Sequence, residues 1–303
     1  MQGSVDGFSY GLVTPLVAFL MACLGGALGL RCTTRALVVA HSWRPGWLAL
    51  GSAAIGSGIW TMHFIAMIGF TVEGAPIHYD KPMTYASLGV AVLMVGVGIF
   101  IVGYKGATGT ALFTGGTITG LGIASMHYLG MAGMRFNGTF EYNTLTVAAS
   151  VAIAMAAATA ALWAAGQVRG FLWSVGASLV MGLAVTGMHY TGMAALSVHL
   201  HTTEAPATGD SAAALLAPML IGPLAFLCLA GIVVMFDPLM VMGKPDWTRA
   251  EHKPGVPAHP SASYSSRRPP VPRPPEGAAP RVPDPAEPLR PAARPRRSPP
   301  RSP

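Results

Sequence analysis

Three apolar segments of the chain each contain a Met-His pair followed by a second Met. They read "TMHFIAM" at 61–67, "SMHYLGM" at 125–131 and "GMHYTGM" at 187–193. In a helix, the histidine and the later methionine lie four residues apart on one face. Imidazole and thioether groups together suit copper, particularly Cu(I). The motifs therefore predict a copper site, whereas zinc would favour Cys or carboxylate partners, and calcium and magnesium oxygen ligands.

Structural hydrogen bonding is the alternative explanation for these histidines. A single buried histidine is more often a hydrogen-bonded core residue than a metal ligand. Three histidines at equivalent positions are a different case, because a polar ring inside an apolar membrane segment is costly and usually functional. Their shared depth favours one shared site.

The motifs belong to an internal repeat. His63, His127 and His189 follow one another after 64 and 62 residues, a spacing that fits one pair of membrane helices. Small residues recur at fixed positions, six and four residues before the first Met of each motif. They are Gly56, Gly120 and Gly182, and Gly58, Gly122 and Ala184. Such residues predict close packing between membrane helices.

The composition is that of a membrane protein. Of the 303 residues, 52% are hydrophobic and 10% are charged. Seven segments are long enough to cross a bilayer as helices: 9–30, 46–70, 83–104, 110–134, 143–166, 172–197 and 212–236. We therefore expect an all-α integral membrane protein with seven transmembrane helices, built from a repeated helix pair and followed by a disordered C-terminal tail.

The basic residues predict the orientation, because cytoplasmic loops retain Lys and Arg. With the N-terminus outside, only Lys81 and Arg135 would lie on the outer side. The inner side would hold the basic tail and Arg31, Arg35, Arg44, Lys105 and Arg169. Arg31 and Arg35 are expected to follow the first helix. We expect a multi-pass protein of the cytoplasmic membrane, with the C-terminus inside and all three motifs near the outer face.

The motif "MHYT" at 188–191 and its variants "MHYL" and "MHFI" resemble the MHYT family of bacterial integral-membrane sensor domains. The resemblance covers about residues 9–200. It implies a six-helix membrane domain with a copper site that senses oxygen, carbon monoxide or nitric oxide. The metal-site residues that it implies are Met62, His63, Met67, Met126, His127, Tyr128, Met131, Met188, His189, Tyr190 and Met193. Phe64 departs from the family pattern, which leaves only Tyr128 and Tyr190 to orient ligands through a hydroxyl.

The expected domains are the six-helix sensor domain at 9–200, the seventh helix at 212–236 and a Pro/Arg-rich cytoplasmic tail at 244–303. The tail contains most of the 26 prolines and nothing that could build a core, so it is expected to be disordered. Its charge could hold it near anionic lipids or a cytoplasmic signalling partner. No nucleic-acid partner is expected, because the basic residues are dispersed and lack a recognition fold.

The expected function is that of a membrane sensor. No nucleophile elbow, phosphate loop or pair of carboxylates indicates an enzyme. One alternative is a haem-binding membrane protein, in which two of the three histidines ligate one iron. The other is a copper transporter, although transport should place ligands at several depths, whereas these motifs lie at one level.

Overall fold

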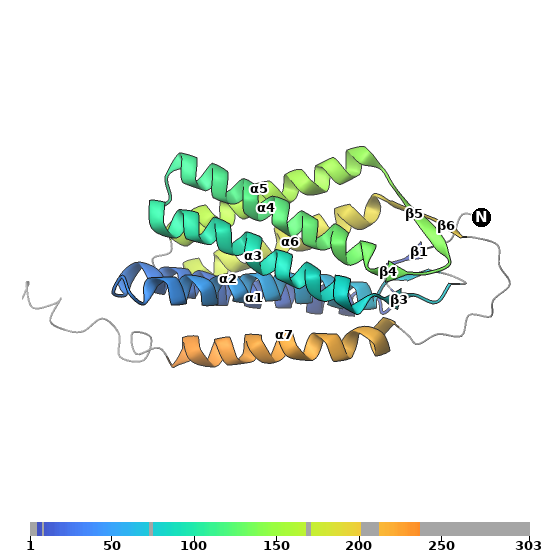
Figure 1. Ribbon diagram of the computed structural model, residues 1–303, viewed down its shortest axis with the longest axis horizontal. Coiled ribbons are helices and arrows are strands. Elements are labelled where there is room, and N and C mark those ends of the chain that lie inside the picture. Colours follow the sequence, from blue (N-terminus) through green and yellow to red (C-terminus); the bar gives the residue numbers. More distant parts are fainter. Residues whose placement is uncertain (1–4, 8, 73–74, 168–170, 201–211, 237–303) are drawn as a thin grey trace, which may run out of the picture. The chain divides into compact units, whose positions relative to one another are not determined.

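The computed structural model describes residues 5–7, 9–72, 75–167, 171–200 and 212–236, without the side chains of residues 5, 171 and 172. The expected tail at 244–303 lies outside the described residues. Long helices dominate this part of the chain (Figure 1). Their bounds are α1 Val13–Val38, α2 Arg44–Ile68, α3 Lys81–Lys105, α4 Gly109–Ala132, α5 Thr144–Gln167, α6 Phe171–Ala194 and α7 Ala212–Met235. The all-helical fold class is therefore confirmed.

Helices α1 to α6 form a closed ring. Each helix packs against the next one along the chain, and α6 packs back against α1. Helix α7 lies outside this ring, mainly against α2 (Figure 1). The ring is therefore assembled from three helix pairs, α1–α2, α3–α4 and α5–α6, as the repeat predicts.

The small residues before the motifs lie at close contacts between neighbouring helices. A Cβ atom added at Gly56 of α2 would overlap Val92 of α3. A Cβ atom at Gly120 of α4 would overlap Met155 of α5, and one at Gly182 of α6 would overlap Cys23 of α1. The predicted role of these three glycines in packing is confirmed, and each one joins a helix pair to the next.

The chain is a multi-pass membrane protein. Among the described helices, α1, α2, α3, α5 and α7 are long and apolar enough by themselves to cross a membrane. Helix α4 does not meet the same measure, because its many Gly and Thr residues make it less apolar. The helices expose large apolar side chains such as Leu93, Phe113 and Leu183, which lipid would cover.

Helix α1 is longer than the sequence predicts. We expected a segment over 9–30 followed by Arg31 and Arg35, but the helix continues to Val38 and contains both arginines. No residue in this stretch breaks a helix, and the Thr33 hydroxyl donates to the Gly29 carbonyl within it. The guanidinium of Arg35 lies 5.8 Å from the ring centroid of Trp47 on α2, a cation–π contact that holds this last turn.

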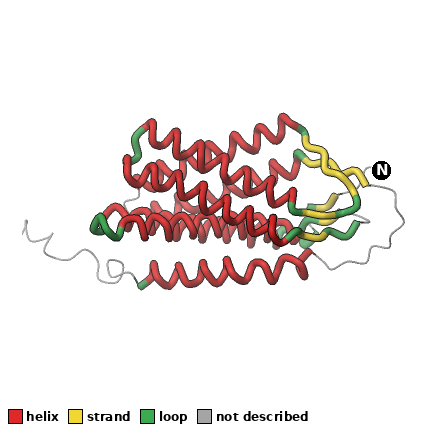
Figure 2. Tube along the Cα trace, in the orientation of Figure 1, coloured by secondary structure: helices red, strands yellow, loops and turns green. Residues whose placement is uncertain are grey.

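Six short strands among the described residues were not predicted. They form three antiparallel pairs: β1 (Val5–Asp6) with β2 (Thr71–Val72), β3 (His78–Tyr79) with β4 (Met134–Arg135), and β5 (Gly138–Tyr142) with β6 (Leu196–Leu200). Each pair joins the residues before the first helix of a pair to those after the second. Figure 2 shows the strands together at one end of the helices. This is the end at which α2, α4 and α6 finish.

Candidate metal centre

The three motif histidines lie at equal depth in three different helices. His63, His127 and His189 each stand five residues before the last residue of their helix, which is Ile68 in α2, Ala132 in α4 and Ala194 in α6. Each side chain is only 1% exposed. The closed ring directs them to one another, because α2, α4 and α6 are the second helices of the three pairs.

The Nδ1 atoms of the three imidazoles form a nearly equilateral triangle. The distances are 3.1 Å from His63 to His189, 3.2 Å from His127 to His63 and 3.3 Å from His189 to His127. The rings are nearly perpendicular to one another, with centroids 5.0 to 5.1 Å apart. Residues separated by more than 120 positions along the chain therefore meet at a single point.

Hydrogen bonds within the triangle cannot satisfy all three nitrogens. A neutral imidazole offers at Nδ1 either one N–H or one lone pair, in the plane of its ring. If one Nδ1 carries a proton, a second proton pointing into the same small space would face the first. A cation at the centre, by contrast, would accept a lone pair from every ring, with the remaining proton on each Nε2.

The triangle also has the right size for a metal ion. Metal–nitrogen bonds of about 2.0 Å at tetrahedral angles place neighbouring ligand nitrogens about 3.3 Å apart. The observed edges of 3.1 to 3.3 Å match this value. Three imidazoles alone would suit zinc as well as copper, so the choice between the two depends on the methionines.

Glycines of the neighbouring motif make room for two of the imidazoles. A Cβ atom at Gly130 would lie 2.6 Å from His63 Nε2, and one at Gly192 would lie 2.5 Å from His127 Nε2. Neither Nε2 atom has a hydrogen-bond partner among the described residues. The polar contacts of both rings are therefore made at Nδ1, inside the triangle. The equivalent position in the first motif is Ala66.

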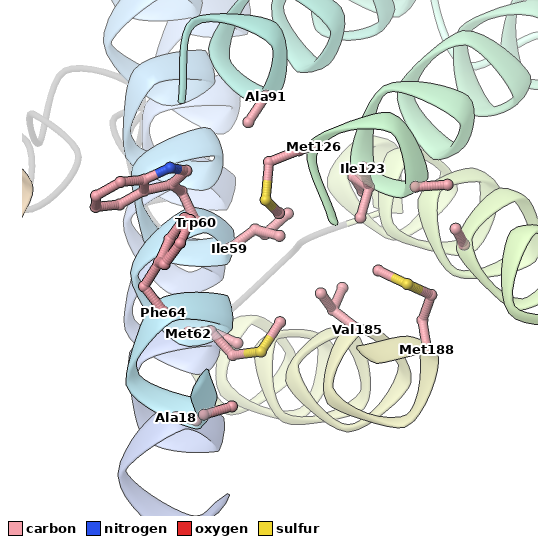
Figure 3. Packing of buried hydrophobic residues seen from close by; sticks show 14 of the residues in the cluster. Ala18, Ile59, Trp60, Met62, Phe64, Ala91, Ile123, Met126, Val185 and Met188 are labelled. Atoms are coloured by element: carbon pink, nitrogen blue, oxygen red, sulfur yellow. The ribbon is translucent and has the colours of Figure 1, made fainter. Parts of the chain in front are cut away.

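The methionines of the motifs belong to the core around the histidines. Met62, Met126 and Met188 are fully buried, and Figure 3 shows them packed with Ile59, Ile123 and Val185 of the same helices. Met67 and Met131 are also buried, whereas Met193 is partly buried against this core. The motifs thus contribute thioethers to the same core region from all three helices.

An aromatic ring follows each histidine and packs edge-on against it. The centroid distances are 4.6 Å for His63 and Phe64, 4.8 Å for His127 and Tyr128, and 4.9 Å for His189 and Tyr190. The hydroxyl of Tyr128 is 2.7 Å from Ser150 Oγ. This hydroxyl therefore ties α4 to α5.

At the first motif, where Phe64 replaces the tyrosine, Trp60 makes the hydrogen bond to the next helix. Its Nε1–H donates to Ser87 Oγ on α3 at 3.0 Å and to the Thr84 carbonyl at 3.2 Å. Ser87 precedes Ser150 by 63 residues, one repeat period, so the two serines are equivalent. Our sequence reasoning missed Trp60, although this spacing of the serines could have revealed the link.

Aromatic residues from the strands at this end of the helices cover the cluster. The Tyr79 ring at the end of β3 lies 6.3 Å from Phe64, and the Tyr142 ring at the end of β5 lies 5.8 Å from Tyr128. Burial raises the pKa of the Tyr79 phenol above its ordinary value, so this side chain stays neutral. The cover therefore brings no anionic group over the histidines at these two positions.

The chain is similar to several bacterial signalling proteins. It is 37% identical over 192 residues to the bifunctional diguanylate cyclase/cyclic di-GMP phosphodiesterase MucR of Pseudomonas aeruginosa, which covers 62% of this chain and 28% of that protein. It is 36% identical over 208 residues to the cyclic di-GMP phosphodiesterase NbdA of the same organism, covering 64% and 26%. The signaling protein YkoW of Bacillus subtilis is 30% identical over 197 residues, covering 63% and 24%. The chain thus spans about a quarter of the length of these relatives, and no solved structure matches it.

Two stretches of the chain match one sequence family. Residues 56–115 and 120–178 each match the family MHYT, described as the bacterial signalling protein N terminal repeat. The two matches begin 64 residues apart, which is also the distance from His63 to His127. The ring, the repeat and the histidine motifs agree with this match. The chain therefore contains repeats of the MHYT family of bacterial signalling proteins over residues 56–178.

Proposed function

We propose that the chain is a membrane sensor that binds one copper ion at His63, His127 and His189 and responds to a diatomic gas. The Nδ1 triangle is the observation that carries this proposal, because its edges of 3.1 to 3.3 Å fit three nitrogens on one ion. Copper held by three nitrogens would supply a coordination position for oxygen, carbon monoxide or nitric oxide. The chain itself fixes the imidazoles and excludes water from them by burial.

The methionines favour copper over zinc. Thioethers are soft ligands that suit Cu(I), whereas zinc sites are usually completed by Cys, carboxylate or water. The six motif methionines lie in or against the core that encloses the histidines, and none of the three motifs contains a carboxylate. A thioether from this set is the proposed additional ligand, and Tyr128 and Tyr190 are proposed to hold the neighbouring imidazoles through ring contacts.

The triangle argues against haem. Two axial nitrogens on one haem iron lie on opposite faces of the macrocycle, about 4 Å apart at bond lengths of about 2.0 Å. The histidine nitrogens are closer together than this, and no macrocycle fits between them. A transport path is also less favoured, because the cavity on the inner side of the triangle has an almost wholly apolar lining.

The sensor would occupy the cytoplasmic membrane with all seven helices across the bilayer. Helices α4 and α6 have the same length as the apolar helix α5 and alternate with α3 and α5 in the ring. They would therefore cross the membrane side by side with α3 and α5. With the N-terminus outside, the metal centre lies near the outer face. Residues 9–200 would form the sensor domain, and α7 and the tail at 244–303 would connect it to a cytoplasmic signalling partner.

Metal analysis of histidine variants tests the proposal. We expect the purified protein to carry about one copper per chain and each of His63→Ala, His127→Ala and His189→Ala to lose most of it, because two imidazoles and the apolar core cannot replace the third ligand. His78→Ala is the matched control, since this exposed histidine lies outside the triangle. Mass spectrometry of the metal content provides the measurement. Wild-type protein without copper, or full copper in all three variants, would show that the histidines are structural.

A further inference from the structure

An apolar cavity lies inside the ring of helices. About 30 Å³ of it is open to the centre of a water-sized molecule. Its lining comes from all six helices of the ring and includes Ile59, Ile123, Val185 and Ala158. The cavity therefore lies between the helix pairs, in the interior of the ring.

The cavity begins one helical turn on the inner side of the histidine triangle. Ile59, Ile123 and Val185 each stand four residues before the histidine of their own helix, which is about 6 Å along the helix axis. Figure 3 shows these three side chains in the space between α2, α4 and α6. The end of the cavity lined by these three side chains therefore lies about one helical turn from the imidazoles.

Water is a poor occupant of this cavity. A buried water usually makes two to four hydrogen bonds, and among the lining residues only Thr33 and Thr119 have polar side chains. The Thr33 hydroxyl already donates to the Gly29 carbonyl at 2.9 Å. The Thr119 hydroxyl is buried and has no hydrogen-bond partner among the described residues. Apolar cavities of this kind stay dry and accept apolar atoms or small molecules.

A thin wall separates the cavity from a groove on the lipid-facing side of α5 and α6. Ala157, Ala161 and Met181 line both the cavity and the groove. The rest of the groove is built mainly from small residues of the two helices, including Ala160, Ala164 and Gly176. Small uncharged molecules dissolved in the bilayer thus need to pass only two alanines and one flexible methionine side chain to enter.

We propose that this cavity is a docking site for a diatomic gas, which enters from the bilayer between α5 and α6. Its size fits this class of ligand, because one water-sized molecule needs about 10–15 Å³ of such space and the cavity offers about twice that volume. The unpartnered Thr119 hydroxyl could donate to a weakly polar gas. The inference deepens the proposed function, since it rests on gas sensing for its role but requires no metal for binding.

Dioxygen is a suitable probe, because it is paramagnetic and speeds the relaxation of nearby methyl groups. The full chain would be studied in lipid nanodiscs, with a chelator present and Ile, Leu and Val methyl groups labelled. Under oxygen pressure we expect several-fold greater relaxation enhancement at Ile59, Ile123 and Val185 than at Leu227, which is as deeply buried but does not line the cavity. Equal enhancement at all four residues would refute the docking site.

Two substitutions change the cavity in opposite directions. Ala158→Val should fill it and lower the enhancement at Ile59 to the level of Leu227. Ala154→Val is the matched control, one turn away on the same helix and equally buried, but outside the lining. Ile123→Ala should enlarge the cavity and raise the enhancement at Ile59 and Val185, so the inference remains testable if the filled variant does not fold. Unchanged enhancement in both cavity variants would overturn it.

Copper analysis of the same samples before chelation separates this inference from the proposed function. Strong oxygen enhancement in a wild-type protein that carries no copper would support the cavity and contradict the copper sensor. Copper at one ion per chain without oxygen enhancement at the cavity would contradict the cavity alone.

Discussion

At the scale of single residues, the triangle of histidines depends on two glycines as much as on the imidazoles themselves. Gly130 and Gly192 stand three residues after His127 and His189, and each leaves the space that the imidazole of a neighbouring helix occupies. Glycine in a helix interior is unfavourable by about 1 kcal/mol relative to alanine. The contact with the imidazole explains why glycine stands at both positions.

Alanine at these glycines should therefore damage the site. Gly130→Ala would place a Cβ atom 2.6 Å from His63 Nε2, and Gly192→Ala one 2.5 Å from His127 Nε2, so each displaces a ring from the triangle. We expect copper content to fall several-fold in both variants, measured by mass spectrometry. Gly187→Ala on α6 is the control, because a Cβ atom there meets nothing within 4 Å. Full copper in Gly130→Ala would mean that the His63 ring is not held where the structure has it.

At the scale of helices and strands, hydrogen bonds of different chemistry occupy equivalent places. Trp60 links α2 to Ser87 of α3, and Tyr128 links α4 to Ser150 of α5. Both serines also donate to the carbonyl three residues earlier, at Thr84 and Val147. The repeat thus preserves the serine acceptor while the donor changes from indole to phenol.

Removal of either donor should loosen one junction between helix pairs. We expect Trp60→Phe and Tyr128→Phe each to lower the free energy of unfolding by about 1 kcal/mol, the usual contribution of one hydrogen bond, with a further loss of packing for the smaller ring at position 60. Tyr85→Phe is the control, since the Tyr85 side chain is 46% exposed. Thermal unfolding of the purified proteins in one detergent provides the comparison. An unchanged unfolding temperature in Tyr128→Phe would contradict a stabilising role for its bond to Ser150.

The helices could be predicted from the sequence because long apolar runs have one stable form in a bilayer. The strands could not, since β1 to β4 have two residues each and their pairing depends on helix ends brought together by the ring. The two five-residue strands, "GTFEY" at 138–142 and "LSVHL" at 196–200, do alternate, but the neighbouring apolar helices concealed this. The predicted end of α1 was wrong. The arginines end the apolar stretch that can lie in the hydrocarbon of a bilayer, but they do not end the helix.

For the metal centre, spacing predicted which residues share a depth but could not predict their distances. The equal separation of the three histidines from the ends of their helices was visible in the repeat. That Nδ1 rather than Nε2 faces the triangle depends on the rotamers, which Gly130 and Gly192 permit. That copper is the bound metal, and that a methionine is one of its ligands, stay predictions.

At the scale of the whole molecule, the distribution of basic residues predicts the orientation in the membrane. We expect a membrane-impermeant thiol reagent to label Thr139→Cys in intact cells and to leave Ser42→Cys unlabelled until the cells are opened. Thr139 lies in β5 at the end of the helices that carries the histidines, and Ser42 lies in the exposed turn between α1 and α2 at the other end. The unsubstituted chain measures background labelling of Cys23, Cys32 and Cys228. Labelling of Ser42→Cys in intact cells would place the metal centre at the inner face.

The closure of α6 onto α1 also sets an order of events during synthesis. The ribosome delivers the histidines one helix pair at a time, and the third imidazole arrives with α6, the last helix of the ring. A nascent chain that stops after α4 holds two imidazoles and an open side where α5 and α6 will pack. The three-nitrogen site therefore comes into existence only when the ring closes, so an ion bound there distinguishes a finished domain from every shorter intermediate.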